Sequence, residues 1–171
     1  MSSRKRICAV ILLLAAVVWI MPAGAGAQPR SLVGSAAPRI SGTAADGSRV
    51  DMPGRGHVTV VAFWNSKYRL SLDALQGIAR IYSSYRSRGL VCLGVNDSGE
   101  SSKSIAAVAG GLGVTYPLIG EGAGSSAAVS YRLQGVPAVF VINPSGLIDS
   151  AFGGWDSSVE AEVRARVGSL L

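Results

Sequence analysis

The hydrophobic positions change period along the chain, which predicts strands that alternate with helices. The run 57–64 is β-branched and almost continuously apolar, as is typical of a strand covered on both faces. From Tyr68 to Tyr85 the apolar positions recur every three or four residues, which predicts an amphipathic helix that ends at Gly89. A second buried strand is expected at 90–95. This strand, helix, strand order is typical of an α/β sheet protein.

The flanking parts of the chain predict a hairpin before this unit and a mixed arrangement after it. Asp46-Gly47 is a hairpin-turn signal between two short extended stretches. Ser157 and Glu160 have the spacing of a capping box at the start of the last helix. The remaining expected elements are helices at 105–109 and 125–131 and strands at 138–142 and 147–152, joined by the turn 143–146. The pattern therefore predicts one α/β domain with a central mixed sheet flanked by helices and an N-terminal β-hairpin extension.

The first 27 residues have the pattern of a secretory signal. Basic residues at Arg4–Arg6 precede the apolar run Ile7–Met21, and Ala25-Gly26-Ala27 matches a cleavage site. The 15 residues of that run are fewer than the roughly 20 that span a bilayer, which favours a cleaved signal over a retained anchor. We therefore expect a signal peptide at 1–27, a domain at 28–171 and an exported, periplasmic or extracytoplasmic protein. Contact with a membrane is expected only if the N-terminal segment is retained.

Composition excludes several classes of function. Hydrophobic residues make up 49% of the 171 residues, which is enough for a real core. The formal net charge is +6, but without the three basic residues at the N-terminus 13 basic residues face 10 acidic ones, too mild an excess for nucleic-acid binding. The chain has two cysteines, Cys8 and Cys92, and one histidine, His57. No disulfide framework, metal site or phosphate-binding glycine loop is predicted, and no cofactor is expected.

Three landmarks, taken in order, resemble the TlpA/ResA-type thioredoxin-like proteins. They are the strand Val60–Trp64 leading into a helix, the segment Gly135–Ile142, and the turn Asn143–Gly146. The resemblance extends from Val33 to the last helix. It implies a thioredoxin-like fold and a secreted or membrane-tethered thiol-disulfide oxidoreductase. It also implies a Cys-x-x-Cys motif at the start of the first helix and a cis proline, here Pro137, facing that motif.

The chain departs from this family at the two reactive positions. Aligning Phe63-Trp64 with the family's Phe-Trp places Tyr68 and Ser71 where the two cysteines would stand. Disulfide exchange proceeds by attack of a thiolate on sulfur, which neither a phenol nor a hydroxymethyl group can replace. His57, the single histidine, lies at the far end of the preceding strand, roughly 20 Å away, and cannot serve Ser71 as a base. Ala74 stands where many relatives carry an acidic residue.

Three functions from different classes follow from this departure. The preferred one is a redox-inactive module that binds a protein or peptide partner in a groove formed by Trp64, Tyr68, Val136 and Pro137. The second is an active thiol-disulfide oxidoreductase or redoxin-like enzyme with Cys92 as its only thiol. The third is a thiol-independent enzyme such as a peroxidase-like relative, although peroxiredoxins also need a cysteine at the position of Tyr68.

Some of these residues also have a purely structural interpretation. Cys92 lies within an apolar strand and is expected to be a buried, inert thiol. Trp64 can cap the core instead of lining a groove. Lys67 and Arg69 flank the expected helix start, where they are either solvated charges or part of an anion site.

Overall fold

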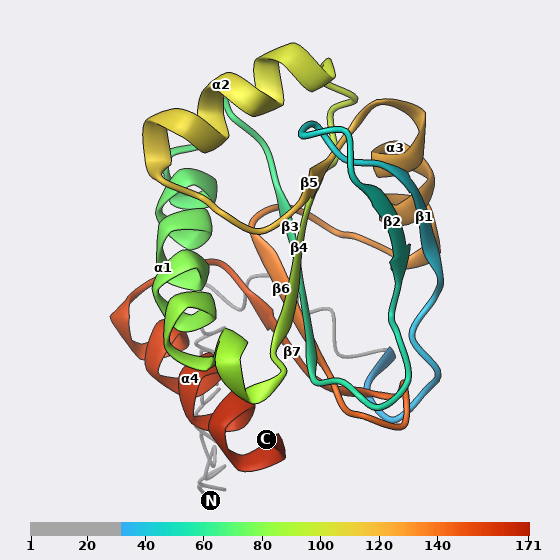
Figure 1. Cartoon of the computed structure of the whole chain (residues 1–171), viewed down its shortest axis with the longest axis vertical. Coiled ribbons are helices and arrows are strands. Elements are labelled where there is room, and N and C mark those ends of the chain that lie inside the picture. The colour runs from blue at the N-terminus through green and yellow to red at the C-terminus, as the bar shows by residue number, and fades with distance from the viewer. Residues whose placement is uncertain (1–31) are drawn as a thin grey trace, which may run out of the picture.

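A computed structural model describes residues 32–171 of the chain (Figure 1). The predicted signal at 1–27, its Cys8 and the start of the mature chain at Gln28 lie outside these residues. The described elements, in chain order, are β1 (Ile40–Thr43), β2 (Arg49–Met52), β3 (Thr59–Trp64), α1 (Arg69–Tyr85), the 3₁₀ turn η2 (Arg86–Arg88), β4 (Val91–Asn96), α2 (Ser102–Leu112), β5 (Leu118–Ile119), α3 (Glu121–Ser130), β6 (Ala138–Ile142), β7 (Ile148–Gly153) and α4 (Ser157–Leu170).

Five strands form one mixed sheet in the order β5-β4-β3-β6-β7, and β1 and β2 form a separate antiparallel hairpin. Strands β3, β4 and β5 are parallel, whereas β6 and β7 run antiparallel to their neighbours. The sheet therefore has β3 at its centre, and all six residues of this strand are buried. This architecture is the mixed α/β sheet with an N-terminal hairpin that the sequence predicts.

The two faces of the sheet are covered by different elements (Figure 1). Buried residues of α1, α2 and α4 pack against one face, with Val60, Ala62 and Trp64 of β3 pointing toward them. The β1–β2 hairpin and α3 cover the other face, toward which Val61 and Phe63 point. Successive side chains of β3 thus point alternately into two cores, which explains why the strand is apolar at nearly every position.

An aromatic cluster fixes α3 against the second face. Phe63 of β3, Phe140 of β6 and Tyr131 after α3 have ring centroids 4.9–5.7 Å apart. The hydroxyl of Tyr131 donates a hydrogen bond to the carbonyl of Pro38 at 3.0 Å. Such tilted aromatic pairs add stability beyond the area that they bury. The cluster therefore sets the position of the chain that leaves α3.

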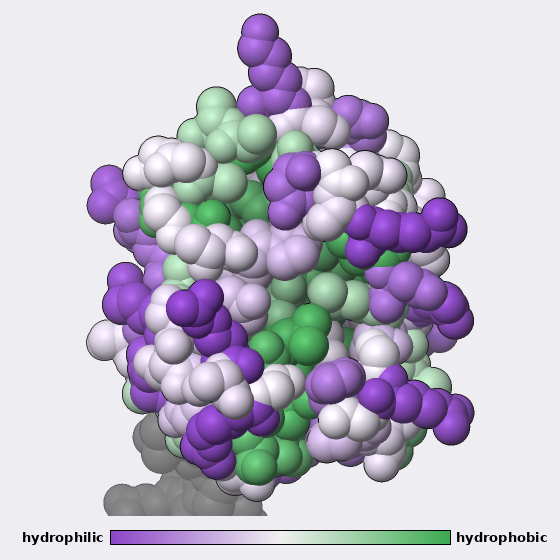
Figure 2. Space-filling view, viewed as in Figure 1, coloured by the Kyte–Doolittle hydropathy of each residue, from purple (hydrophilic) through white to green (hydrophobic). Residues whose placement is uncertain are grey.

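Several element boundaries differ from the sequence-based expectation. The N-cap of α4 is Asp156, whose side chain accepts a hydrogen bond from the Val159 amide, and not the predicted Ser157. Helices α2 and α3 are longer than the predicted ranges 105–109 and 125–131. The sequence pattern underestimated their length because their outer faces carry Ala, Gly and Ser, which add no apolar periodicity. Figure 2 shows the apolar side chains that α2 exposes at one end of the molecule. None of the helices described at 32–171 is both long and apolar enough to cross a membrane.

Candidate functional site

The register of the central strands brings the two predicted site segments together. In the antiparallel β3–β6 ladder Phe63 faces Ala138, so the following Trp64 lies at the level of Pro137. The loop after β3 leads into α1, and the Val136–Pro137 bond just before β6 is cis, as the resemblance implies. A second cis bond, Met52–Pro53, is not predicted from the sequence. The start of α1 and the cis-proline loop therefore share one end of the sheet.

Tyr68 is the N-cap residue of α1, but its side chain makes no capping hydrogen bond. Its backbone is extended, its carbonyl accepts hydrogen bonds from the Ser71 amide at 3.0 Å and the Leu72 amide at 3.3 Å, and its ring is exposed. In the alignment predicted from the resemblance, the family's attacking cysteine would stand here, where a helix N-terminus stabilises a thiolate. A phenol at this point presents an apolar ring to solvent and supplies no sulfur.

Ser71 is fully buried in the first turn of α1, and its Oγ has no hydrogen-bond partner. An exposed or base-activated hydroxyl could act as a nucleophile, but this one has neither solvent nor a base. A buried hydroxyl without a partner costs about 1–3 kcal/mol of stability. The structure therefore gives Ser71 no chemical role and makes it a local source of instability.

Removing this hydroxyl is expected to stabilise the protein. Ser71→Ala should raise the free energy of unfolding by about 1 kcal/mol, because it deletes an unpaired polar group and introduces a better helix former. Urea denaturation measures the change. Ser83→Ala is the matched control, since Ser83 is an exposed serine of the same helix and reports the gain in helix propensity alone. A Ser71→Ala gain no larger than that of the control would contradict this interpretation.

Of the four residues of the predicted groove, the structure exposes Tyr68 and partly exposes Val136. Trp64 and Pro137 are buried, so neither side chain can contact a partner directly. The indole of Trp64 packs in the core formed with α1 and α4. Trp64 therefore has the structural role that the sequence offered as the alternative to lining a groove. The accessible apolar and backbone surface at this end includes Tyr68 (55% exposed), Leu70 (52%), Gly135 and the half-buried Val136. We call these four residues the Tyr68 surface.

A polar network that the sequence analysis did not identify holds the loop before Tyr68. The Glu100 carboxylate accepts hydrogen bonds from the Ser66 hydroxyl at 2.7 Å, the Ser66 amide at 3.3 Å and the Asn96 side-chain amide at 2.9 Å. The hydroxyls of Ser98 and Ser104 donate to the same carboxylate. Asn96 itself is fully buried, and its Oδ1 accepts a hydrogen bond from the Glu100 backbone amide. One carboxylate therefore connects the loop after β3 to the loop after β4.

These hydrogen bonds outweigh burial in setting the protonation of Glu100. Burial raises the pKa of this carboxyl, but the hydrogen bonds from Ser66, Asn96 and Ser98 together bring the pKa below its ordinary value of 4.5. Glu100 is therefore ionised at neutral pH. The sequence signal for this network is that polar residues stand at the ends of two neighbouring parallel strands, with Ser66 in the loop after β3 and Asn96 as the last residue of β4.

Cys92 lies away from this site. It is opposite Val60 in the β3–β4 ladder, four residues and therefore about 13 Å before the end of β3. The thiol is free and buried, and burial raises its pKa well above the ordinary range. The predicted burial of this thiol is confirmed, and its lack of reactivity stays a prediction that the burial supports.

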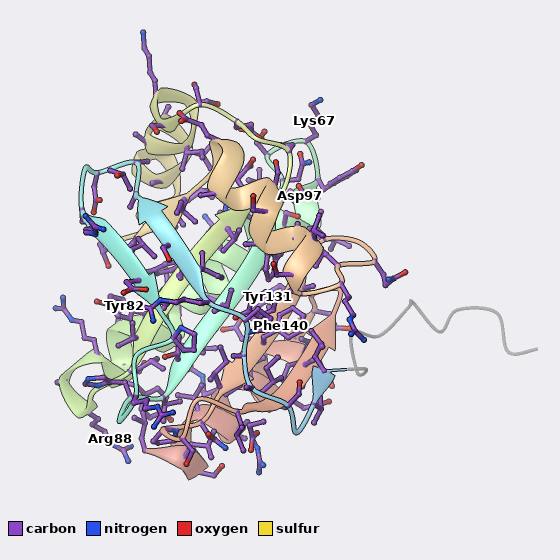
Figure 3. The ribbon with its side chains drawn as sticks, turned by 90° about the vertical axis from the view of Figure 1, so that its right-hand side faces the viewer. Lys67, Tyr82, Arg88, Asp97, Tyr131 and Phe140 are labelled. Carbon is purple, nitrogen blue, oxygen red and sulfur yellow. The ribbon has the colours of Figure 1, made fainter. Side chains whose placement is uncertain are left out.

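The other charged candidates do not form a catalytic group. Arg69 pairs with Asp73 one helical turn further on, at 2.9 Å, and Lys67 is exposed (Figure 3). His57 is exposed just before β3, at the opposite end of this strand from Tyr68. Within 32–171 no cluster of three His, Cys, Asp or Glu side chains could hold a metal ion.

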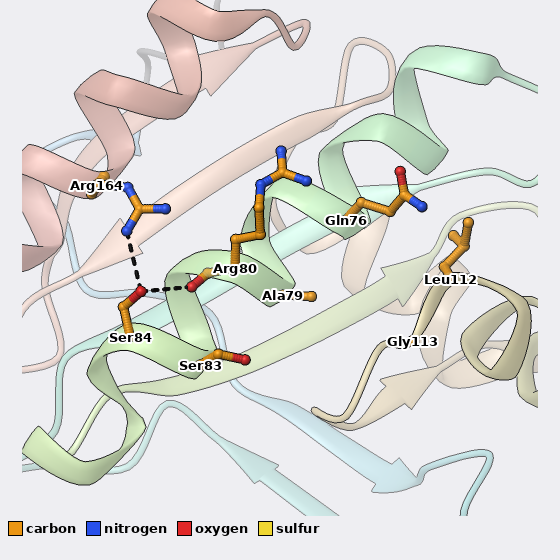
Figure 4. Close-up of a pocket in the computed structure, with 8 residues that line it drawn as sticks. All are labelled: Gln76, Ala79, Arg80, Ser83, Ser84, Leu112, Gly113 and Arg164. Atoms are coloured by element: carbon orange, nitrogen blue, oxygen red, sulfur yellow. Dashed lines mark hydrogen bonds between the residues drawn. The ribbon is translucent and has the colours of Figure 1, made fainter.

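A separate pocket over the outer face of α1 is also without reactive chemistry (Figure 4). Its two cations, Arg80 and Arg164, both approach the Glu160 carboxylate, at 2.6 and 3.8 Å. Arg164 also donates to the Ser84 hydroxyl, which in turn donates to the Arg80 carbonyl. Glu160 thus holds both cations in place, although one carboxylate leaves a net charge of +1 on the three side chains. The described lining contains no activated nucleophile, general base or metal ligand set, so the pocket does not define a catalytic site.

The central mixed sheet, the helix that begins beside a cis proline and the hairpin extension define a thioredoxin-like protein. Solved structures with the same fold include a putative protein disulfide isomerase from Bacteroides thetaiotaomicron, with a TM-score of 0.73, 22% identity, and coverage of 81% of this chain and 89% of that one. A putative thiol:disulfide interchange protein DsbE from Chlorobium tepidum has a TM-score of 0.71 at 15% identity, with 79% and 94% covered. StoA from Bacillus subtilis has a TM-score of 0.62 at 17% identity, with 75% and 97% covered.

Residues 33–151 match the AhpC/TSA family, and the chain belongs to that family. No curated protein matches the chain. The family and the fold together confirm the thioredoxin-like identity predicted from the resemblance to TlpA/ResA-type proteins. The names of the first two of these structures refer to disulfide exchange. That Tyr68 and Ser71 stand at the two cysteine positions stays the prediction drawn from the resemblance.

Proposed function

We propose that this chain is an exported thioredoxin-like protein that has lost thiol chemistry and binds a protein or peptide partner through the Tyr68 surface. The observation that carries the proposal is the state of the two aligned positions. Tyr68 offers an exposed phenol and Ser71 a buried hydroxyl without a partner. Neither group can form the mixed disulfide through which thiol exchange proceeds.

The exposed apolar residues support a binding role. Tyr68 and Leu70 are each more than half exposed, on a loop and helix start that the hydrogen bonds from Ser66 to Glu100 hold in place. Large apolar side chains displayed on a rigid frame beside a second loop are typical of a protein interaction site. The N-terminal pattern of residues 1–27 supports export, because it combines a basic start, an apolar run and a small-residue cleavage site.

A disulfide-reduction assay tests the redox half of the proposal. In a Cys8→Ser background, where Cys92 is the only thiol, the protein should reduce insulin with dithiothreitol no faster than the buffer does. Turnover above the buffer that disappears on Cys92→Ala would contradict the proposal and favour an oxidoreductase that uses this thiol. Peroxide consumption above the buffer would instead favour a redoxin-like enzyme.

A pair of leucine variants tests the binding half. Leu70→Ala should weaken the binding of apolar peptides, because it removes exposed surface beside Tyr68. Leu147→Ala is the matched control, since Leu147 is an exposed leucine next to the β6–β7 turn at the opposite end of β6. Equal binding by wild type and both variants would contradict the proposed surface.

A further inference from the structure

A groove at the C-terminal end of α3 continues the Tyr68 surface. It encloses about 420 Å³ and is lined by Asp97, Ala128, Val129, Arg132, Leu133, Gln134 and Gly135. We call it the Arg132 groove. Gly135 belongs to both surfaces. Asp97 accepts a hydrogen bond from the side chain of Asn65 at 3.0 Å, and Asn65 in turn receives the Lys67 amide. Lys67 and Asp97 accordingly lie at the same end of the molecule in Figure 3.

Arg132 occupies a backbone position that normally belongs to glycine. The Leu133 amide donates to the Ala128 carbonyl and the Arg132 amide to the Val129 carbonyl, both at 3.0 Å, which is the Schellman ending of a helix. This ending places Arg132 at φ 49°, in the left-handed region. A side chain there costs stability that glycine would not. The chain nevertheless carries an exposed arginine at this point, on the wall of the groove.

The positive and negative side chains at the groove differ in how exposed they are and in whether the chain itself pairs with them. Arg132 forms no salt bridge with any residue of the described range 32–171, and neither does Lys67. Asp97, the one carboxylate of the lining, is half-buried and already accepts the Asn65 hydrogen bond. Asp97 keeps its negative charge, because the Asn65 amide is neutral, but it is half-buried, whereas Arg132 is exposed and has no salt-bridge partner in the described range. A ligand that approaches from solvent therefore meets the cation first, which favours negative charge on the ligand at this wall.

The groove also offers an apolar contact. Val129 is 79% exposed, the most exposed of the large hydrophobic side chains described, and Leu133 is half-buried beside it. An exposed branched side chain on the last turn of α3 has no role in the core. A cation next to an apolar wall matches a ligand that has both a carboxylate and an aliphatic side chain.

We propose that the Arg132 groove selects partner segments in which an acidic residue lies next to an apolar one. The partner carboxylate pairs with Arg132, and its apolar neighbour packs against Val129 and Leu133. This inference rests on the proposed partner-binding function, for which it names the chemistry of the partner.

Three fluorescent octapeptides that differ in one property test the inference. Each alternates apolar residues with a variable residue, which is Glu in the first peptide, Gln in the second and Lys in the third. Fluorescence anisotropy at low salt should show the Glu peptide binding about fivefold or more tighter than the Lys peptide. Arg132→Glu should reverse this order, whereas Arg55→Glu, the same charge change near the β6–β7 turn, should leave it unchanged.

The glycine variant separates recognition from stability. Arg132→Gly should abolish the preference for the Glu peptide while raising the melting temperature, because it removes both the charge and the left-handed side chain. A preference that survives both Arg132 variants, or that Arg55→Glu changes equally, would overturn the inference alone. Binding of none of the peptides, or binding that Leu70→Ala does not weaken, would overturn the proposed function itself.

Discussion

Replacing Tyr68 and Ser71 together by cysteine is expected to give the protein a disulfide-reductase activity that, on our proposal, the natural chain does not have. The two positions are one helical turn apart, within the separation of about 4.4–6.8 Å between Cα atoms that a disulfide needs. Position 68 is the exposed N-cap of α1, where the helix terminus stabilises a thiolate, and position 71 is buried behind it. The rate of insulin reduction should rise about tenfold or more over the buffer.

The single variants provide the controls for this gain. Tyr68→Cys alone has an attacking thiol but no second sulfur to resolve the mixed disulfide, and Ser71→Cys alone has a buried thiol that cannot attack. Neither should turn over. If the double variant folds with an unchanged circular dichroism spectrum and melting temperature but stays inactive, the placement of the site at these two residues is contradicted.

Removing the Glu100 carboxylate is expected to destabilise the protein by about 2–4 kcal/mol at neutral pH. Glu100→Ala leaves the buried amide of Asn96 and both donors of Ser66 without their acceptor. Urea denaturation measures the loss. Glu162→Ala is the matched control, because Glu162 is exposed and accepts only a 3.5 Å contact from Ser158, so its removal should change stability by less than about 0.5 kcal/mol.

The pH dependence of this difference has a definite sign. The pKa of Glu100 is lowered in the folded state, so its carboxylate stabilises the fold above the unfolded-state value and loses that effect as the pH falls below 4.5. The gap between wild type and Glu100→Ala should therefore narrow between pH 7 and pH values below 4.5. A gap of the same size at both ends would show that the carboxylate charge is not what stabilises the loop.

The strands and the cis-proline loop could be predicted from the sequence, because the strands have local signals and the loop belongs to the ordered landmarks. The continuous apolar run of β3 reports burial on two faces, and Asn143–Gly146 carries its own turn chemistry, with Gly146 at φ 83°. The cis bond before Pro137 followed from the resemblance and is confirmed. Each of these features depends on residues that are adjacent in the chain or on a motif that spans a few positions.

What the sequence could not show depends on long-range geometry. Whether Trp64 lines a groove or fills the core is decided by how closely α1 and α4 pack, and the structure buries it. From the sequence, Glu100 looks like a solvated loop residue. Its hydrogen bond from Ser66 becomes visible only when the loops after β3 and β4 are brought together in the structure. Arg132 reads as a surface charge until its backbone angle and the end of α3 are known.

The proposed loss of thiol chemistry requires that the folded protein has no reactive thiol at its surface, and a thiol titration measures this directly. In the Cys8→Ser background, the folded protein should show no thiol that reacts rapidly with a chromogenic disulfide reagent at neutral pH. One equivalent should appear once denaturant exposes Cys92. Rapid reaction of one equivalent in the folded protein would contradict the account, because it would show an accessible thiolate in a chain whose site is proposed to have none.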